Sequence, residues 1–564
     1  TLSFPEGSRH WFPSYDHPSD RATQETIITV QQDYQAISNG RLVSITKNDD
    51  AGTHTFHWHL EQSHPTFLSV LVAGPSVGIK DTHGDLPLTY WVYPKDKDDA
   101  MRSFGKTPEI LQFLEDTYGV PYPWVRYDQI TIPGIGGGAE STTATVVGES
   151  TIHDERADQD FPSHWLVAHE AAHHWWGNMI SYRDWTHTWL SESFATFSEY
   201  LWSAHSMGPD EGALNLQGKK AAYLNEAKNK YMRPIVFDRW EYPNQNFDSH
   251  TYPKGAVIVN MMRAYLGEKA FGRVMQHFLT KHAFQPVETS NFLTAIKDVT
   301  GENLDWFFDQ WIHSPGHPVF EITSSWDAQE KLIRLSVAQV QDTTGGVPIF
   351  KMPAQIGITT ADGHRSESIM LNAPRQTFTF QSEQAPLLVR FDEGNILLKE
   401  WTYEKSTAEL QYQLSHDDVM GRIWAAQQLQ SRLGEKDVIQ ALKQRMEEDA
   451  FWAVRRAATQ ALAKQTYPEQ IAWFREVAVQ DSHGRARAAA LKALAGYEKE
   501  SLGKFFKERF DKDDSYVAQA AALEALGSTG DIEWVSFLES QQEQKSPRNV
   551  IKSAAEKALT RLKR

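Results

Sequence analysis

The sequence predicts a multidomain α+β protein with four units in series, and three observations support this prediction. A chain of 564 residues is too long for one hydrophobic core. Short runs rich in Val, Ile and Thr, separated by turn-forming residues, occur near the N-terminus and again after residue 317. The C-terminal part repeats a helical pattern at nearly constant spacing, which is typical of stacked helix pairs.

Residues 1–96 are expected to form a β-sheet domain. Three runs there have the composition of strands, and stretches such as SNG and KNDDAGT separate them: 25–34, 54–61 and 66–74. Helical spacing dominates residues 97–317, as in the segment SFGKTPEILQFLEDTYG. One clear strand, YDQITI, precedes a glycine-rich turn in this second unit.

Residues 318–403 are expected to form a small β-sandwich, because five strand-like runs follow one another in a short stretch: 331–341, 354–360, 367–372, 376–381 and 386–392. Residues 404–564 are expected to form an α-solenoid. A leucine recurs there with an alanine four positions before it, at Ala425/Leu429, Ala458/Leu462, Ala490/Leu494, Ala522/Leu526 and Ala555/Leu559. The pattern resembles HEAT repeats, which serve either as a surface for a protein partner or as a structural lid.

Composition excludes several function classes. With 56 Lys+Arg against 73 Asp+Glu the formal net charge is −17, which argues against a nucleic-acid binder. No apolar run is long enough to span a membrane. The chain has no cysteine, so disulfides and thiolate ligands are excluded, and His and carboxylates must hold any metal ion.

The stretch LVAHEAAHHWWGN carries the strongest chemical signal. His169 and His173 are four positions apart and therefore share one face of a helix, where both imidazoles can bind one metal ion. Glu170 lies about 100° round the helix and can address the attacking water. Glu192 in the segment WLSESFA supplies a third ligand and leaves one zinc position open. Glu199, seven residues later on the same face, could orient a ligand imidazole.

The alternative for each of these residues is an ordinary position in a packed core. His174 and His187 fit a packed core histidine and are set aside. Burying two imidazoles and two carboxylates beside apolar residues without an ion is costly. The pattern therefore predicts one Zn²⁺ per chain.

The motifs HEAAH with Glu192, HHWWGN and WLSESFA resemble the gluzincin aminopeptidases of peptidase family M1, the aminopeptidase N and leukotriene hydrolase group. Residues 7–23 and 37–45 resemble the N-terminal β domain of that family, and residues 252–271 and 306–322 resemble the end of its catalytic domain. The resemblance implies a thermolysin-like, mainly α catalytic domain over residues 97–317. It also implies that the chain begins about a hundred residues into the family's N-terminal domain, which is then only partial.

The resemblance also assigns substrate-binding residues. The family binds the substrate amine with a Gly-Ala-Met-Glu-Asn motif, and Gly137, Gly138, Ala139, Glu140 and Ser141 align with it, with Ala139 in place of Met and Ser141 in place of Asn. A free α-amine is cationic near neutral pH and favours a carboxylate such as Glu140. The segment GIGGGA does not open a helix, so it does not fit a dinucleotide-binding loop. It fits the edge of a β-sheet, along which an extended peptide can lie. Tyr252 matches the family's catalytic tyrosine.

The sequence thus predicts a zinc aminopeptidase acting on peptides with a free N-terminus. Two alternatives remain open: an inactive or weak binding protein on a peptidase scaffold, favoured by the altered motif at 139 and 141, or a zinc endopeptidase. The sequence does not indicate a cellular compartment, because similar bacterial proteins occur in the cytoplasm and in the envelope.

Overall fold

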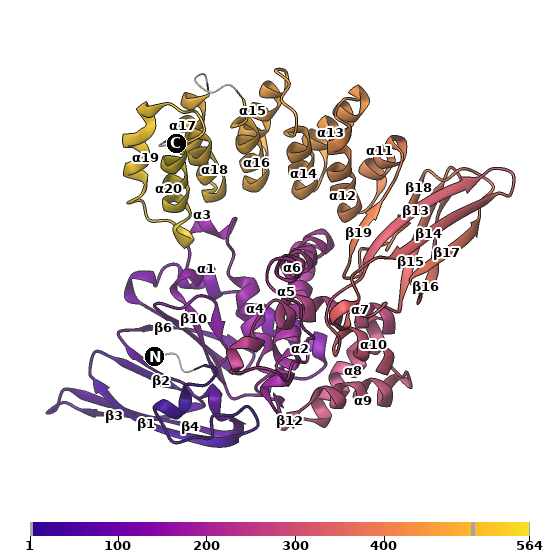
Figure 1. Cartoon of the computed structure of the whole chain (residues 1–564). Coiled ribbons are helices and arrows are strands. Elements are labelled where there is room, and N and C mark those ends of the chain that lie inside the picture. The colour runs from indigo at the N-terminus through magenta and orange to yellow at the C-terminus, as the bar shows by residue number, and fades with distance from the viewer. Residues whose placement is uncertain (1–3, 498–501, 563–564) are drawn as a thin grey trace.

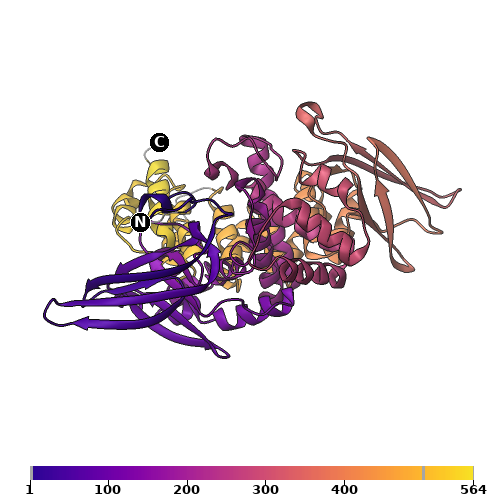
Figure 2. The ribbon, with the colours of Figure 1, turned by 90° about the horizontal axis from the view of Figure 1, so that it is seen from below.

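The computed structural model describes residues 4–497 and 502–562 (Figure 1). N-terminal β-sheets are followed by a helical unit, a β-sandwich and a C-terminal series of helix pairs. The last unit arches over the helical unit, from the sandwich at one end to α3 (Glu155–Asp158) at the other. The N-terminal sheets and the sandwich project from opposite ends of the molecule (Figure 2). The expected fold class is confirmed.

The N-terminal β-structure consists of a three-stranded antiparallel sheet, in the order β1-β4-β3, and the pair β2 and β5. The strand bounds are β1 Arg21–Gln31, β2 Gln35–Ser38, β3 Arg41–Asn48, β4 Thr53–Pro65 and β5 Leu71–Gly74. Phe56 and Trp58 of β4 are buried against Ile130 and Val146 of the next sheet. This apolar contact joins the N-terminal strands to the helical unit.

The next sheet has five strands in the order β6-β7-β8-β10-β9 and spans the expected division after residue 96. The bounds are β6 Val77–His83, β7 Leu86–Val92, β8 Tyr127–Ile132, β9 Gly138–Ala139 and β10 Ala144–Gly148. Because β7 pairs in parallel with β8, residues 77–92 belong to the same sheet as the glycine-rich segment. The sequence of a strand does not reveal which strand it pairs with. The prediction from the sequence therefore assigned these strands to the N-terminal domain.

The helices of the second unit surround one apolar core that contains many of the tryptophans. Trp175, Trp176, Trp189, Trp202 and Trp311 are almost completely buried there. The helices are α1 Ala100–Phe104, α2 Thr107–Tyr118, α3, α4 His164–Ala172, α5 Trp189–Met207, α6 Pro209–Asn229, α7 Gly255–Leu266, α8 Glu268–Lys281, α9 Thr289–Thr300 and α10 Asp305–Trp311. A short parallel pair, β11 (Ser181–Tyr182) and β12 (Pro286–Val287), closes the turn after α4.

The third unit has two facing sheets, in the orders β17-β14-β13-β19 and β16-β15-β18. Their strands are β13 Val319–Asp327, β14 Leu332–Gln339, β15 Met352–Thr360, β16 Gly363–Leu371, β17 Arg375–Gln381, β18 Leu388–Phe391 and β19 Glu400–Tyr403. Alternate residues of β13 and β14 are buried between the sheets, as the alternating sequence pattern predicts.

The fourth unit is a solenoid of paired helices. Its helices are α11 Thr407–His416, α12 Val419–Leu429, α13 Lys436–Glu448, α14 Trp452–Leu462, α15 Gln470–Gln480, α16 Gly484–Leu494, α17 Gly503–Lys512, α18 Tyr516–Leu526, α19 Val535–Gln541 and α20 Val550–Leu562. The repeated Ala and Leu positions lie on α12, α14, α16, α18 and α20, which contact one another in series. All five repeat alanines are fully buried, because their small side chains let adjacent helices approach closely.

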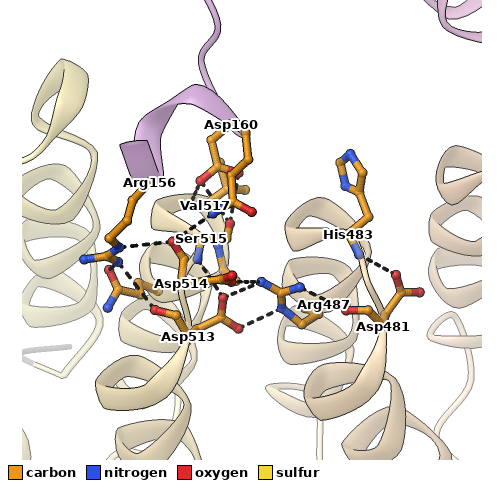
Figure 3. Close-up of polar contacts among 12 residues, drawn as sticks. Arg156, Asp160, Asp481, His483, Arg487, Asp513, Asp514, Ser515 and Val517 are labelled. Atoms are coloured by element: carbon orange, nitrogen blue, oxygen red, sulfur yellow. Dashed lines mark hydrogen bonds and ion pairs between the residues drawn. The ribbon is translucent and has the colours of Figure 1, made fainter. Parts of the chain in front are cut away.

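Ion pairs between successive repeats run along the solenoid. An arginine of one repeat contacts an aspartate of the next, at Arg422–Asp449 (2.9 Å), Arg455–Asp481 (2.7 Å) and Arg487–Asp513 (2.7 Å). The next position in this series holds Gln519 instead of arginine. Arg156 of α3 donates to the Gln519 side-chain oxygen at 2.7 Å, so this position of the series contacts the helical unit (Figure 3).

Candidate active site

Two histidines and a glutamate meet where α4 ends and α5 begins. The Nε2 atoms of His169 and His173 are 3.1 Å apart. Glu192 Oε2 lies 3.4 Å from His169 Nε2 and 3.2 Å from His173 Nε2. The turn after α4 reverses the chain direction and sets the first turn of α5 against the histidine face of α4. All three side chains are buried.

The other ring nitrogen of each histidine, Nδ1, has an acceptor partner, which keeps a proton on Nδ1. His169 Nδ1 lies 2.8 Å from Glu199 Oε1, and His173 Nδ1 lies 3.0 Å from the Trp176 carbonyl oxygen. A carboxylate and a carbonyl only accept hydrogen bonds, so both Nδ1 atoms donate. Both Nε2 atoms take no part in these hydrogen bonds and point toward Glu192. Glu199 is in turn held by Lys219, whose Nζ donates to its Oε2 at 2.6 Å.

This donor set fits zinc. Ligands held tetrahedrally at about 2.0–2.1 Å from zinc lie about 3.3 Å from one another, close to the spacing of the three atoms here. Burial works to lower the pKa of His169, but hydrogen bonds to Glu192 and Glu199 raise it well above its usual value. Burial works to raise the pKa of Glu192, yet His173 and His169 hold it at about 2. Glu192 and Glu199 thus favour positive charge at this position, and a bound divalent ion would supply that charge in place of the Nε2 protons.

Glu170 points from α4 toward the glycine-rich strand β9. A β-carbon on Gly138 would lie 2.3 Å from Glu170 Oε1, so glycine at this position leaves space for the carboxylate where it now lies. The second oxygen, Oε2, is buried and has no hydrogen-bond partner in the described part of the chain. Burial raises the pKa of Glu170 to about 7, although His169 and His173 counteract this. A carboxylate with a pKa near neutrality is suited to take up and return a proton.

Glu140 follows β9 directly and reaches the same buried cluster. Oxygen and nitrogen atoms of Glu140, Glu170 and His173 all lie within 4.8 Å of one another. The Asn178 side chain donates to the Glu140 carbonyl at 2.7 Å and holds this turn in place. Burial raises the pKa of the Glu140 carboxyl. Because β9 is the edge of its sheet, its outer side is free of any neighbouring strand in the described residues.

Tyr252 lies beside His169 of the cluster. Its ring lies parallel to the His169 ring, with the ring centres 6.1 Å apart. It belongs to a π-helical turn, His250–Lys254, where Asp248 accepts hydrogen bonds from the backbone N–H groups of His250 and Thr251 at 2.9 and 3.1 Å. Single π-helical turns are frequent at functional sites. Burial raises the pKa of the Tyr252 phenol well above its usual value, so the phenol stays a donor.

A cavity of about 490 Å³ lies beside this cluster, between the helical unit and the solenoid. Glu199 and Tyr252 form its wall next to the cluster, and Trp452, His483 and Arg485 form its wall on the solenoid. Its volume is in the range of pockets that take small ligands.

The structure thus brings together all the site residues expected from the sequence. Gly137 and Ala139 are the chain neighbours of Gly138, and Ala139 pairs with Val146 of β10. The two histidines set aside as core residues are used structurally: His174 Nε2 accepts the Thr143 backbone N–H at 3.1 Å, and His187 contacts Thr289.

Sequence reasoning missed the supporting residues Lys219, Ser191, Asn178 and Asp248. Ser191 Oγ lies 2.9 Å from His173 Nδ1, and the other three hold Glu199, the turn at Glu140 and the π-helical turn. Ser191 stands one residue before Glu192 and could have been suspected from this position. The others lie on separate elements, and no local pattern identifies them.

Comparisons with known families agree with this geometry. Residues 102–311 match the peptidase family M1 domain, residues 3–68 match the peptidase M1 N-terminal domain, and residues 407–495 and 439–527 match HEAT repeats. The chain thus carries the M1 N-terminal domain over residues 3–68 and the M1 peptidase domain over residues 102–311.

Several aminopeptidases are similar to this M1 chain in sequence. Aminopeptidase M1 of Arabidopsis thaliana is 26% identical over 331 residues, which are 56% of this chain and 36% of that protein. Probable aminopeptidase 1 of Sulfurisphaera tokodaii is 26% identical over 390 residues, which are 67% of this chain and 47% of that protein. The chain thus spans less than half of the length of these two relatives.

The fold also matches a solved structure. Legionella pneumophila aminopeptidase A in complex with aspartic acid superposes with a TM-score of 0.75 at 19% identity, over 100% of this chain and 70% of that one. At this identity the likeness shows the fold. No helix in the described residues combines the length and apolar character needed to cross a bilayer.

Proposed function

We propose that this M1 chain is a zinc-dependent aminopeptidase that removes N-terminal residues from peptides. The observation that carries the proposal is the single buried cluster in which His169, His173 and Glu192 converge while Glu140 stands beside them at a free strand edge. The three converging residues would hold zinc. A carboxylate at the strand edge would bind the α-amine and select the chain end. The names of the similar proteins, all aminopeptidases among those described above, support the same reaction.

The chemistry divides between the metal and the chain. A bound zinc ion acts as a Lewis acid and lowers the pKa of water. Glu170, with its pKa near 7, accepts a proton from the attacking water and passes it to the leaving amine nitrogen. Tyr252 donates a hydrogen bond to the oxyanion that develops on the attacked carbonyl. Glu140 binds the substrate ammonium group, and β9 aligns the peptide backbone as an added strand.

A panel of aminoacyl p-nitroanilides tests the proposal. The protein supplied with zinc should release p-nitroaniline, and a chelator should abolish this release until zinc is restored. If the protein binds no zinc and hydrolyses none of these substrates, it is instead a binding protein on a peptidase scaffold. If peptides with blocked N-termini are cleaved as fast as free ones, the protein is an endopeptidase and Glu140 has no amine-binding role.

Glu199→Gln is expected to lower zinc affinity by about 10- to 100-fold, because the residue orients the His169 ring and makes it a better ligand. Competition with a chromophoric chelator measures the zinc dissociation constant directly. The exposed Glu109 lies on α2, and Glu109→Gln serves as the matched control, which should leave the constant unchanged. An unchanged zinc affinity in Glu199→Gln would contradict the proposed orienting role.

A further inference from the structure

The turn that carries Glu140 has a strained backbone. Residues 140–143 connect β9 to β10, and the Ala144 backbone N–H donates to the Ser141 carbonyl oxygen at 2.9 Å across this turn. Thr143 has a φ of 67°, in the left-handed region that β-branched residues rarely occupy. Such a conformation persists only where the surrounding contacts fix it, and residues of this kind cluster at functional sites.

Hydrogen bonds from two other parts of the chain hold the second half of the turn. Asn39 Nδ2 donates to the Thr142 carbonyl oxygen at 2.7 Å, and the Gly40 backbone N–H donates to Thr143 Oγ1 at 2.8 Å. The Thr143 backbone N–H donates to His174 Nε2 at 3.1 Å. Residues 39 and 40 connect β2 to β3, so the N-terminal β-structure helps to fix the strained residue.

Asn178 holds the first half of the turn, at Glu140 itself. Its side chain donates to the Glu140 carbonyl oxygen at 2.7 Å, and its backbone N–H donates to the His173 carbonyl oxygen at 3.0 Å. Its own carbonyl oxygen accepts a hydrogen bond from Arg21 Nη2 of β1 at 3.0 Å. Asn178 is completely buried. This one residue therefore ties the Glu140 turn to the end of the helix that carries both histidines and to the N-terminal sheet.

The separation between Glu140 and the histidines has to be constant for a substrate that uses both. The amine nitrogen and the carbonyl carbon of one amino-acid residue are about 2.5 Å apart, because only the α-carbon lies between them. A carboxylate that binds the amine and a metal site that receives the carbonyl must therefore keep a fixed spacing. A small shift of the Glu140 turn away from His173 would release one of these two contacts.

We propose that Asn178 is a positioning residue, which holds Glu140 at the distance from His169 and His173 at which a free α-amine is bound. Asn39 supports the same turn from the N-terminal strands. This inference rests on the proposed aminopeptidase function, since it assumes that Glu140 binds the amine. It adds that selectivity for a free N-terminus depends on a buried amide outside the set of residues that bind the substrate.

Two ligands that differ only in the amine test this inference: alanine hydroxamate and propanehydroxamic acid, which lacks the α-amine. Calorimetry on the full chain supplied with zinc gives the dissociation constant of each. The wild-type protein should bind the amine-bearing ligand about 10- to 100-fold more tightly, as expected for a hydrogen bond to a charged group. Asn178→Ala should bring this ratio close to one and leave the dissociation constant of propanehydroxamic acid unchanged. Asn39→Ala should lower the ratio by a smaller factor, because it releases Thr142 and not Glu140.

Asn260→Ala is the matched control. Asn260 is also buried, lies on α7 and accepts a hydrogen bond from Arg263 Nη1 of the same helix at 3.4 Å. This variant should keep the wild-type ratio. If Asn178→Ala weakens the binding of both ligands by the same factor, Asn178 only supports the fold and the inference is overturned. If Asn178→Ala does not fold, Asn39→Ala decides, and an unchanged ratio in that variant overturns the inference.

The same measurements separate this inference from the proposed function. If the wild-type protein prefers the amine-bearing ligand and Asn178→Ala keeps the full preference, the aminopeptidase proposal stands and this inference alone fails. If the wild-type protein binds the two ligands alike, or binds neither, Glu140 does not bind an amine. Both proposals then fail.

Discussion

Glu170→Gln is expected to lower kcat by about 10³-fold or more while the chain keeps its zinc. The amide of glutamine has nearly the size of the carboxylate, but it cannot accept the proton of the attacking water. Gly138 leaves space for this side chain at its present position, so the substitution should not displace β9. A loss of this size corresponds to about 4 kcal/mol of transition-state stabilisation.

Two measurements separate this loss from other causes. Metal analysis should find the same zinc content in Glu170→Gln and wild type, because Glu170 is not among the three converging ligands. Glu109→Gln on the exposed face of α2 provides a matched control with normal turnover. Full activity in Glu170→Gln would contradict the mechanism.

Tyr252→Phe is expected to lower kcat by about 10²- to 10³-fold, because it removes one donor to the developing oxyanion. The ring should keep its place, since the π-helical turn is held by the backbone bonds to Asp248 and not by the phenol oxygen. Turnover of an aminoacyl p-nitroanilide measures the effect, which should fall on kcat more than on KM.

The exposed Tyr15 provides the comparison for this change, and Tyr15→Phe should have wild-type kcat. If Tyr252→Phe instead raised KM alone, the phenol would contribute to substrate binding in the ground state. The proposed role at the oxyanion would then be wrong.

Much of the site was predictable because it is local in sequence. The spacing of His169 and His173 places both rings on one helix face whatever surrounds the helix. Glu192 and Glu199 share a face of the next helix for the same reason. The 32- to 33-residue recurrence of Ala and Leu likewise predicted the solenoid, because each repeat buries the same face against its neighbour.

Contacts between distant segments were not predictable in this way. Lys219 reaches Glu199 from α6, and Asp248 orders the turn of Tyr252, yet neither carries a pattern of its own. The pairing of β7 with β8 places residues 77–92 in one sheet with strands of the expected catalytic unit, because strand neighbours depend on the whole sheet.

The sequence by itself therefore determined the family motifs, the candidate metal donors and the order of the units, all of which depend on patterns that are local in sequence. Only the tertiary structure decided that the solenoid arches back to α3 and that Arg156 of α3 contacts Gln519 of the repeat series (Figure 1). Arg156 and Gln519 are 363 positions apart in the sequence. No sequence pattern links residues so far apart, and only the folded chain brings them into contact.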